Sequence, residues 1–247
     1  MTSPIWGTPG PAAGTGRTGG RDAGPGLPGA DEAGFTGLRA GTLVEVLERT
    51  RTITVSRHDH DIEDAERHDY ELLTPDRRLR LARLEHRPTR MNQLAGPLLP
   101  APYLLIDEHL HPVTGLLRSP RIGRGPARFE LSGPLTGSAG QESRPHEPRI
   151  RVTTGQGRVM WLSGASWNAG RYQVADGVRE DGTPGRVIAG VERESNGYLT
   201  GTFRYQVTFR HALPGPDRLL LLVAVMLLDE LGRGKKENAA TWGVRAR

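Results

Sequence analysis

Ten consecutive apolar residues, Leu219 to Leu228, form the most hydrophobic stretch of the chain. Asp217 precedes this run as a candidate N-cap, and Gly232 follows it as a candidate left-handed residue that ends a helix. The pattern predicts a helix from Asp217 to Leu231 that is apolar on every side. Such a helix is enclosed by protein or by a membrane, and this run is much shorter than the roughly 20 residues that cross a bilayer. We therefore expect a helix buried by the rest of the chain.

Short β-rich runs separated by turn-forming residues recur through the middle of the chain. Each unit joins two runs through a segment rich in Asp, Gly, Thr or Pro, residues that favour turn conformations. The four units, each interpreted as a hairpin, span Tyr70–Arg87, Tyr103–Pro120, Arg149–Gly164 and Tyr172–Arg193. The next segment, Gly201–Arg210, alternates aromatic or β-branched residues with polar ones, which predicts a strand with one buried face.

Thr42–Val55 contains the runs LVEVL and TITV and is enriched in β-branched residues, which favours a first strand or a first hairpin. With the four hairpins and the last strand, the chain supplies about ten to twelve strands. An antiparallel sheet of this size can bury its apolar face by closing into a barrel, and a barrel of more than eight strands has room for a helix. We therefore predict a mainly β fold, a closed antiparallel barrel of about twelve strands around a buried C-terminal hydrophobic helix.

The two ends of the chain differ from its middle in composition. Residues 1–40 are rich in Gly, Pro, Thr and Ala, and they show neither hydrophobic periodicity nor the apolar run of a signal peptide. Such a segment cannot bury enough surface to offset its ordering entropy, so it is predicted to be a disordered tail. The barrel is predicted to span 41–234, with 217–231 as its central helix, and 235–247 is predicted to be a C-terminal tail.

The C-terminal part of the chain resembles the tubby C-terminal-like superfamily, which includes tubby-like proteins, phospholipid scramblases and LURP-one-related proteins. YQVADG followed by GRVIAGVER resembles the penultimate hairpin of the family, FRYQVTF its last strand, and RLLLLVAVMLLDEL its central helix. The earlier units match in pattern only, and the resemblance extends over about Thr42–Gly234. It implies a closed barrel of twelve strands around a buried helix. Some members bind phosphoinositides or move phospholipids, and many have no assigned activity.

Two features of phospholipid scramblases are missing from this sequence. Their acid-rich calcium segment beside the final helix corresponds here to HALPGPDR, in which Asp217 is the single acid, so calcium dependence is not expected. The chain has no cysteine, which excludes a cysteine-rich palmitoylation segment, disulfides and thiolate metal sites. A cysteine-free chain fits a reducing compartment, and we predict a cytoplasmic protein that is peripheral to membranes.

The formal net charge is +5, and nearly all positive charge is arginine, because lysine occurs only at positions 235 and 236. Arginine favours bidentate contact with phosphate or carboxylate, although arginine, glycine, proline and alanine also rise together when codons are rich in G and C. Four arginines, Arg118, Arg121, Arg124 and Arg128, crowd the segment between the second and third predicted hairpins. This segment is either an exposed, solvated loop or a patch that binds lipid or other anions, and its arginines are the candidate site.

Other chemical signals favour ordinary structural roles. Residues His58 to Asp61 carry ligand-type side chains, but consecutive residues point to opposite faces of a strand, which favours a solvated loop over a metal site. His109 and His111 can share a strand face, yet no third ligand is apparent. The segment GASWN around Ser166 lacks the second glycine of a nucleophile elbow. The sequence thus predicts no catalytic residue, no metal and no cofactor.

Together these observations favour a non-enzymatic barrel that binds anionic phospholipid or acts as a scaffold. Its expected partners are anionic membrane surfaces or phospholipid headgroups, and no nucleic acid is expected. The alternative is an enzyme or effector, hydrolase-like, with a site that only the fold assembles. A cleft with converging titratable groups would favour this alternative, whereas a barrel with a basic surface would favour the binding function.

Overall fold

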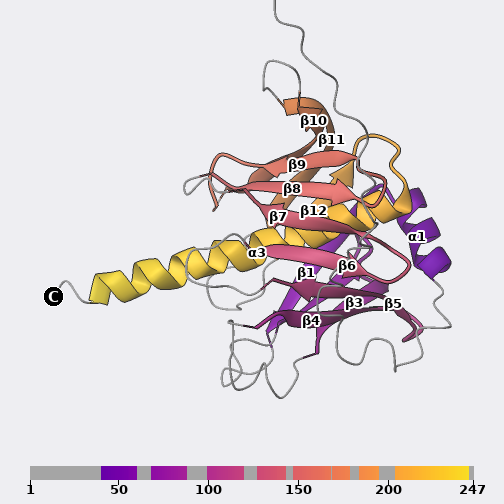
Figure 1. The fold of residues 1–247 in the computed structure, drawn as a ribbon, viewed down its shortest axis with the longest axis horizontal. Coiled ribbons are helices and arrows are strands. Elements are labelled where there is room, and N and C mark those ends of the chain that lie inside the picture. Colours follow the sequence, from indigo (N-terminus) through magenta and orange to yellow (C-terminus); the bar gives the residue numbers. More distant parts are fainter. Residues whose placement is uncertain are drawn as a thin grey trace, which may run out of the picture. The chain divides into compact units, whose positions relative to one another are not determined.

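The computed structural model describes residues 40–59, 68–87, 99–119, 127–142, 147–167, 169–178, 184–194 and 204–244. Within these residues the chain forms twelve strands and two helices (Figure 1). In chain order the elements are α1 Ala40–Arg49, β1 Thr52–Asp59, β2 His68–Leu73, β3 Arg80–His86, β4 Ala101–Asp107, β5 Pro112–Arg118, β6 Arg128–Ser132, β7 Gly137–Gln141, β8 Arg149–Thr154, β9 Val159–Ser163, β10 Arg171–Val178, β11 Pro184–Glu194, β12 Arg204–Phe209 and α3 Gly215–Val244.

The twelve strands form one closed antiparallel barrel. Each strand pairs with its neighbours in the chain, and β1 closes the barrel by pairing with β12, where Ile53 lies opposite Val207. Closure gives every strand a partner on both sides, which removes the exposed edges of an open sheet. The predicted mainly β fold with about twelve barrel strands is confirmed.

The apolar part of α3 fills the interior of this barrel. Every residue from Leu219 to Leu228 is at most 2% exposed, although these side chains point in all directions around the helix axis. The strands direct alternate residues toward the helix, as in β8, where Ile150 and Val152 are fully buried and Arg151 is exposed. The predicted enclosure of the hydrophobic helix is therefore confirmed. Among the described residues, no helix combines the length and the apolar character that a bilayer crossing requires.

The close approach of β7 to α3 depends on a glycine. Gly137 has a φ of 148°, and a Cβ atom at this position would lie 2.5 Å from Leu220 Cδ1 and 2.8 Å from the backbone oxygen of Thr153. Both separations are shorter than real Cβ contacts. Glycine at this position therefore allows the helix to pack directly against β7.

The bounds predicted for the helix were wrong at both ends. The helix begins at Gly215, and Asp217 lies in its first turn, where its carboxylate accepts a hydrogen bond from Arg158 Nη1 at 3.0 Å. It also continues beyond Gly232 to Val244, so that Gly232 does not end it and most of the predicted C-terminal tail is helical. The helix thus continues through two interior glycines, Gly232 and Gly234, each of which costs about 1 kcal/mol relative to alanine. The predicted N-terminal tail, 1–40, lies outside the described residues apart from Ala40.

The segment LVEVL forms α1 and not the predicted strand. Leu43 and Leu47 are four residues apart and both buried, because this spacing places them on one face of a helix. Arg218 of α3 donates to the backbone oxygens of Leu47 and Thr50, both at 2.6 Å, and so binds carbonyls at the C-terminal end of α1. Packing against α3 thus overrides the β propensity of the two valines in this segment.

The hairpin of β6 and β7 was not predicted. The segment was interpreted as a connection between hairpins, but Arg128 begins β6, and β7 follows with the sequence GSAGQ. Glycine and alanine have low strand propensity, so β7 carries no local signal, and its pairing with two neighbouring strands holds it in the sheet.

Candidate anion-binding site

The four candidate arginines do not form one patch among the described residues. Arg118 is the last residue of β5, Arg128 is the first residue of β6, and Arg121 and Arg124 lie outside the described residues. The adjoining Ser119 joins the two strand ends, because its backbone N–H donates to Arg128 O at 2.7 Å and its Oγ accepts from Arg128 N at 2.9 Å. From these adjacent positions, Arg118 and Arg128 direct their side chains to different environments.

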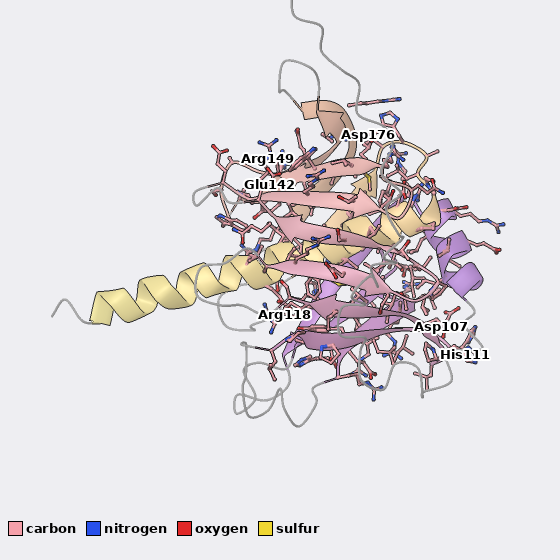
Figure 2. The ribbon with its side chains drawn as sticks, in the orientation of Figure 1. Asp107, His111, Arg118, Glu142, Arg149 and Asp176 are labelled. Atoms are coloured by element: carbon pink, nitrogen blue, oxygen red, sulfur yellow. The ribbon has the colours of Figure 1, made fainter. Side chains whose placement is uncertain are left out.

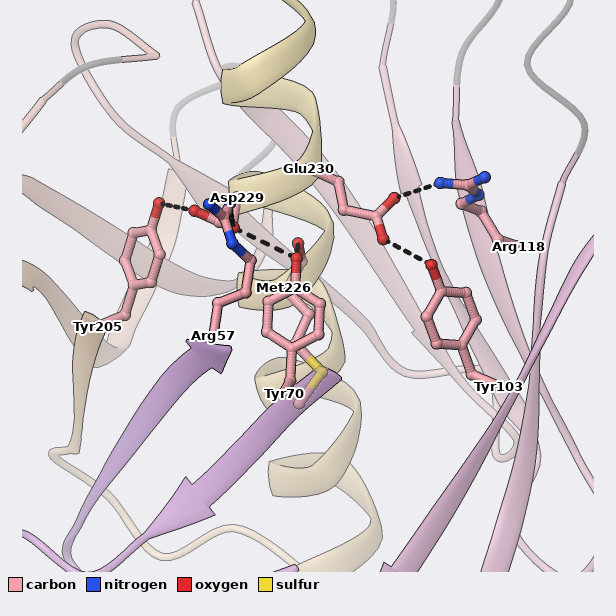
Figure 3. A network of polar contacts seen from close by, with 8 residues as sticks. All are labelled: Arg57, Tyr70, Tyr103, Arg118, Tyr205, Met226, Asp229 and Glu230. Carbon is pink, nitrogen blue, oxygen red and sulfur yellow. Dashed lines mark hydrogen bonds and ion pairs between the residues drawn. The ribbon is translucent and has the colours of Figure 1, made fainter. Parts of the chain in front are cut away.

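Arg118 points toward α3 and pairs with Glu230 (Figure 3). Its Nη1 lies 3.0 Å from Glu230 Oε2, and the Tyr103 hydroxyl donates to Glu230 Oε1 at 3.0 Å. Burial alone would lower the pKa of Arg118, but the charge of Glu230 raises it above the ordinary arginine value. The guanidinium is therefore held by an internal partner, and the interpretation of Arg118 as part of an exposed surface does not fit its position.

A second polar cluster surrounds Asp229 on a neighbouring side of α3 (Figure 3). Its carboxylate accepts hydrogen bonds from Arg57 Nη1 at 2.6 Å, from the Tyr205 hydroxyl at 3.0 Å and from the Tyr70 hydroxyl at 3.3 Å. Burial, and then the negative charge of Asp229, raise the pKa values of Tyr70 and Tyr205 well above 10.0. The side chains of Arg57 and Asp229 are 1% and 2% exposed, so this cluster orients the helix and is closed to solvent.

Arg128 instead lies on the outer face of the barrel, in register with two residues of the neighbouring strands. It is directly opposite Gly140 of β7, and Gly140 is directly opposite Arg151 of β8. Residues that face each other across paired strands project to the same side of a sheet. Because Gly140 has no side chain, the two arginines flank an open position between them.

This open position is part of a groove of about 580 Å³ on the outer wall formed by β6, β7 and β8. Its lining residues are Ser119, Ala127, Arg128, Ser138, Gly140, Gln141, Glu142, Arg151 and Thr153. The groove exists because β7 presents Ser138 and Gly140 to the outside, while longer side chains stand on both adjacent strands. We call this surface the β7 groove.

The charges around the β7 groove leave an excess of arginine. Arg128 Nε lies 3.2 Å from Glu130, and its Nη2 donates to Ser138 Oγ at 3.1 Å. On the other side, Glu142 lies 3.7 Å from Arg149, and Figure 2 labels both of these residues. Arg151 has no carboxylate within ion-pair distance among the described residues.

An indole stands beside the β8 arginines. The Arg149 guanidinium lies 4.5 Å from the centre of the Trp161 ring, and the Arg151 guanidinium lies 5.9 Å from it. Cation–π contacts of this kind hold a guanidinium against the barrel wall without neutralising its charge. The β7 groove therefore combines a small-residue floor with positively charged walls, an arrangement that suits a compact oxyanion.

The remaining histidine signals correspond to turns and strand ends. His58 and Asp59 end β1, whereas the next two residues of the HDHD run lie outside the described residues. His109 and His111 lie within the β4–β5 turn, and their backbone N–H groups donate to the Asp107 carboxylate at 2.9 and 2.8 Å. Within the described part of the chain, no three His, Asp or Glu side chains are grouped so as to hold a metal ion.

Gly140 and Arg151 were not predicted as site residues. Arg151 belongs to the predicted strand RIRV, whose alternation already placed its arginines on the outer face. Gly140 could not be recognised, because its strand has no β-type sequence signal and only pairing brings it between the two arginines. The alternation of Phe129 and Leu131 with polar residues in β6 was the one local sign that this hairpin exists.

Comparisons of this chain with protein-family models, with curated proteins and with solved structures found no match.

Proposed function

We propose that this protein is a non-enzymatic barrel that binds anionic phospholipid surfaces through the outer wall formed by β6, β7 and β8. The observation that carries this proposal is the β7 groove, in which Arg128 and Arg151 flank Gly140. A guanidinium offers planar N–H donors that match phosphate oxygens, and its charge persists at any physiological pH. Anion binding is therefore assigned to Arg128, which is one of the four predicted arginines, and to Arg151, which was not predicted.

The filled barrel interior favours ligand binding at the outer surface. Side chains from Leu219 to Leu228 occupy the interior space of the barrel in which a lipid chain would otherwise have to lie. The polar cluster on α3 gives little support to the enzymatic alternative, because the Asp229 side chain is 2% exposed and a substrate could not reach it.

The proposal includes membership of the tubby C-terminal-like superfamily and a cytoplasmic location at membrane surfaces. A closed barrel of twelve strands around an apolar helix is the architecture that the sequence resemblance implies, and it supports this assignment without identifying the family. Calcium dependence is not part of the proposal, because Asp217 near the start of α3 is engaged by Arg158.

The test is sedimentation of the full chain with phosphatidylserine-containing vesicles and with neutral phosphatidylcholine vesicles. We expect binding to the anionic vesicles alone, weakening between 0.1 and 1 M salt as the Debye length falls from about 10 to about 3 Å. Replacing Arg128 and Arg151 by serine removes about 1 kcal/mol each, or roughly 30-fold in affinity together.

The matched control replaces Arg78 and Arg171 by serine. These side chains are 85% and 84% exposed, so the control removes the same charge from other parts of the surface. Equal binding to neutral vesicles, or an equal loss in both double variants, would contradict the proposed function.

A further inference from the structure

We infer that the β7 groove is a discrete site for a single phosphate group, held between the guanidinium groups of Arg128 and Arg151 above Gly140. This inference rests on the proposed function and names the ligand chemistry of its site. The ligand is a phosphate group whose oxygens are free to accept hydrogen bonds. It is carried either by a lipid headgroup or by a soluble molecule.

The strand register sets the spacing of the two arginines. Adjacent strands lie about 4.8 Å apart, so the backbones of β6 and β8 are separated by roughly 10 Å across β7. Arg128 and Arg151 both stand opposite Gly140, on the same side of the sheet. Two guanidinium groups on stems of this length can converge on one anion at the charge-assisted hydrogen-bond distance of about 2.8 Å.

Gly140 leaves room for the stem of Arg128, which passes over this position on the outer face. A Cβ atom at this position would lie 3.4 Å from Arg128 Cγ, in contact with the arginine stem. A larger side chain would therefore press against this stem and displace Arg128. The glycine does not serve an unusual backbone angle, and the open space is the property that the site uses.

The groups around the gap are poised to receive an anion. Ser138 Oγ accepts from Arg128 Nη2, which leaves its own O–H free to donate. Thr153 adds a second hydroxyl to the lining. Arg151 has no carboxylate partner among the described residues, Glu142 lies near Arg149, and Glu130 contacts Arg128 through Nε alone, which leaves N–H groups of Arg128 for an anion. Two guanidiniums and a hydroxyl together match three oxygens of a phosphate, whereas a carboxylate offers only two.

The experiment is an NMR titration of the full chain with inorganic phosphate at constant ionic strength, with sodium chloride as the reference. We expect saturable shifts of the Gly140 amide and of the Nε–H groups of Arg128 and Arg151. Gly140→Val keeps every charge but fills the gap, and we expect at least tenfold weaker phosphate binding. Gly190→Val is the matched control, because Gly190 is a strand glycine in β11 with similar space around it.

Vesicle binding separates the two sources of phosphate. Stronger binding to phosphatidic acid than to phosphatidylserine, lost in Gly140→Val but kept in Gly190→Val, supports a lipid headgroup. Saturable inorganic phosphate binding without any vesicle binding supports the phosphate site but contradicts the proposed membrane function.

One pair of results would overturn the inferred phosphate site and leave the proposed membrane function intact. In that case inorganic phosphate gives only linear shifts, and Gly140→Val binds anionic vesicles as strongly as the unaltered chain. Arg151→Gln provides the same test through a surface substitution if Gly140→Val does not fold, since it removes one guanidinium from the site and should also abolish saturation.

Discussion

Leu110 combines two unfavourable features in the short turn between β4 and β5. It has a φ of 65°, a left-handed conformation that costs an L-residue roughly 1–2 kcal/mol, and its side chain is 71% exposed. The turn is held by the Asp107 carboxylate, which accepts from the backbone of His109 and His111. The conformation is therefore imposed by the hydrogen bonds of its neighbours and not by packing of the leucine.

We expect Leu110→Gly to raise the free energy of unfolding by about 0.5–1 kcal/mol. Glycine relieves the left-handed conformation, and its greater unfolded-state entropy offsets part of this gain. Urea denaturation measures the difference. The control is Leu79→Gly, which removes a leucine that is 62% exposed but has an ordinary φ. A similar change in both variants would mean that backbone strain at Leu110 is not the cause.

At the scale of elements, sequence patterns located those segments whose local signal agrees with their final environment. The apolar run of α3 and the strands with clear alternation, such as RYQVTF in β12, were predictable from side-chain periodicity. α1 and β7 were not, because tertiary pairing overrides local propensity in both. The same limit applies to the site: Arg128 was predicted, but its partners in the β7 groove depend on a strand that the sequence does not mark.

Arg158, in the turn between β8 and β9, links β10 to α3 and gives a prediction about acid stability. Its guanidinium contacts Asp176 of β10 at 2.7 and 2.9 Å and Asp217 of α3 at 3.0 Å. The hydrogen bond from Arg158 is the main reason that the pKa of Asp176 lies below its ordinary value of 3.8. Because the folded pKa is the lower one, this stabilisation is fully present above about pH 4 and disappears as the pH falls through the folded pKa.

We therefore expect Arg158→Gln to lower the urea midpoint at pH 7 and to reduce the further loss of stability between pH 4 and pH 2. Urea denaturation across this range measures both effects. Arg171→Gln, which removes an 84% exposed arginine near Glu192, is the control and should leave the acid dependence unchanged. If Arg158→Gln loses as much stability in acid as the unaltered chain, the three-way contact does not contribute as described.

At the scale of the whole molecule, the barrel has a filled interior, and one part of its outer wall, the β7 groove, is rich in arginine. The interior is occupied by α3, whose rotation about its axis is set by Asp229 and Glu230 through their contacts with five strands. The proposed binding surface is therefore on the outside of the barrel, at the β7 groove and its arginines. We propose that this wall, and not another side of the barrel, faces an anionic membrane.

Single-cysteine labelling measures this orientation directly, because the chain has no cysteine of its own. An environment-sensitive fluorophore is attached at Thr153→Cys in the β7 groove or at Gln173→Cys on the exposed face of β10. With phosphatidylserine-containing vesicles at 0.1 M salt, we predict a blue shift for the label at 153 and none for the label at 173. Equal shifts at both positions, or a shift at 173 alone, would contradict the proposed binding wall.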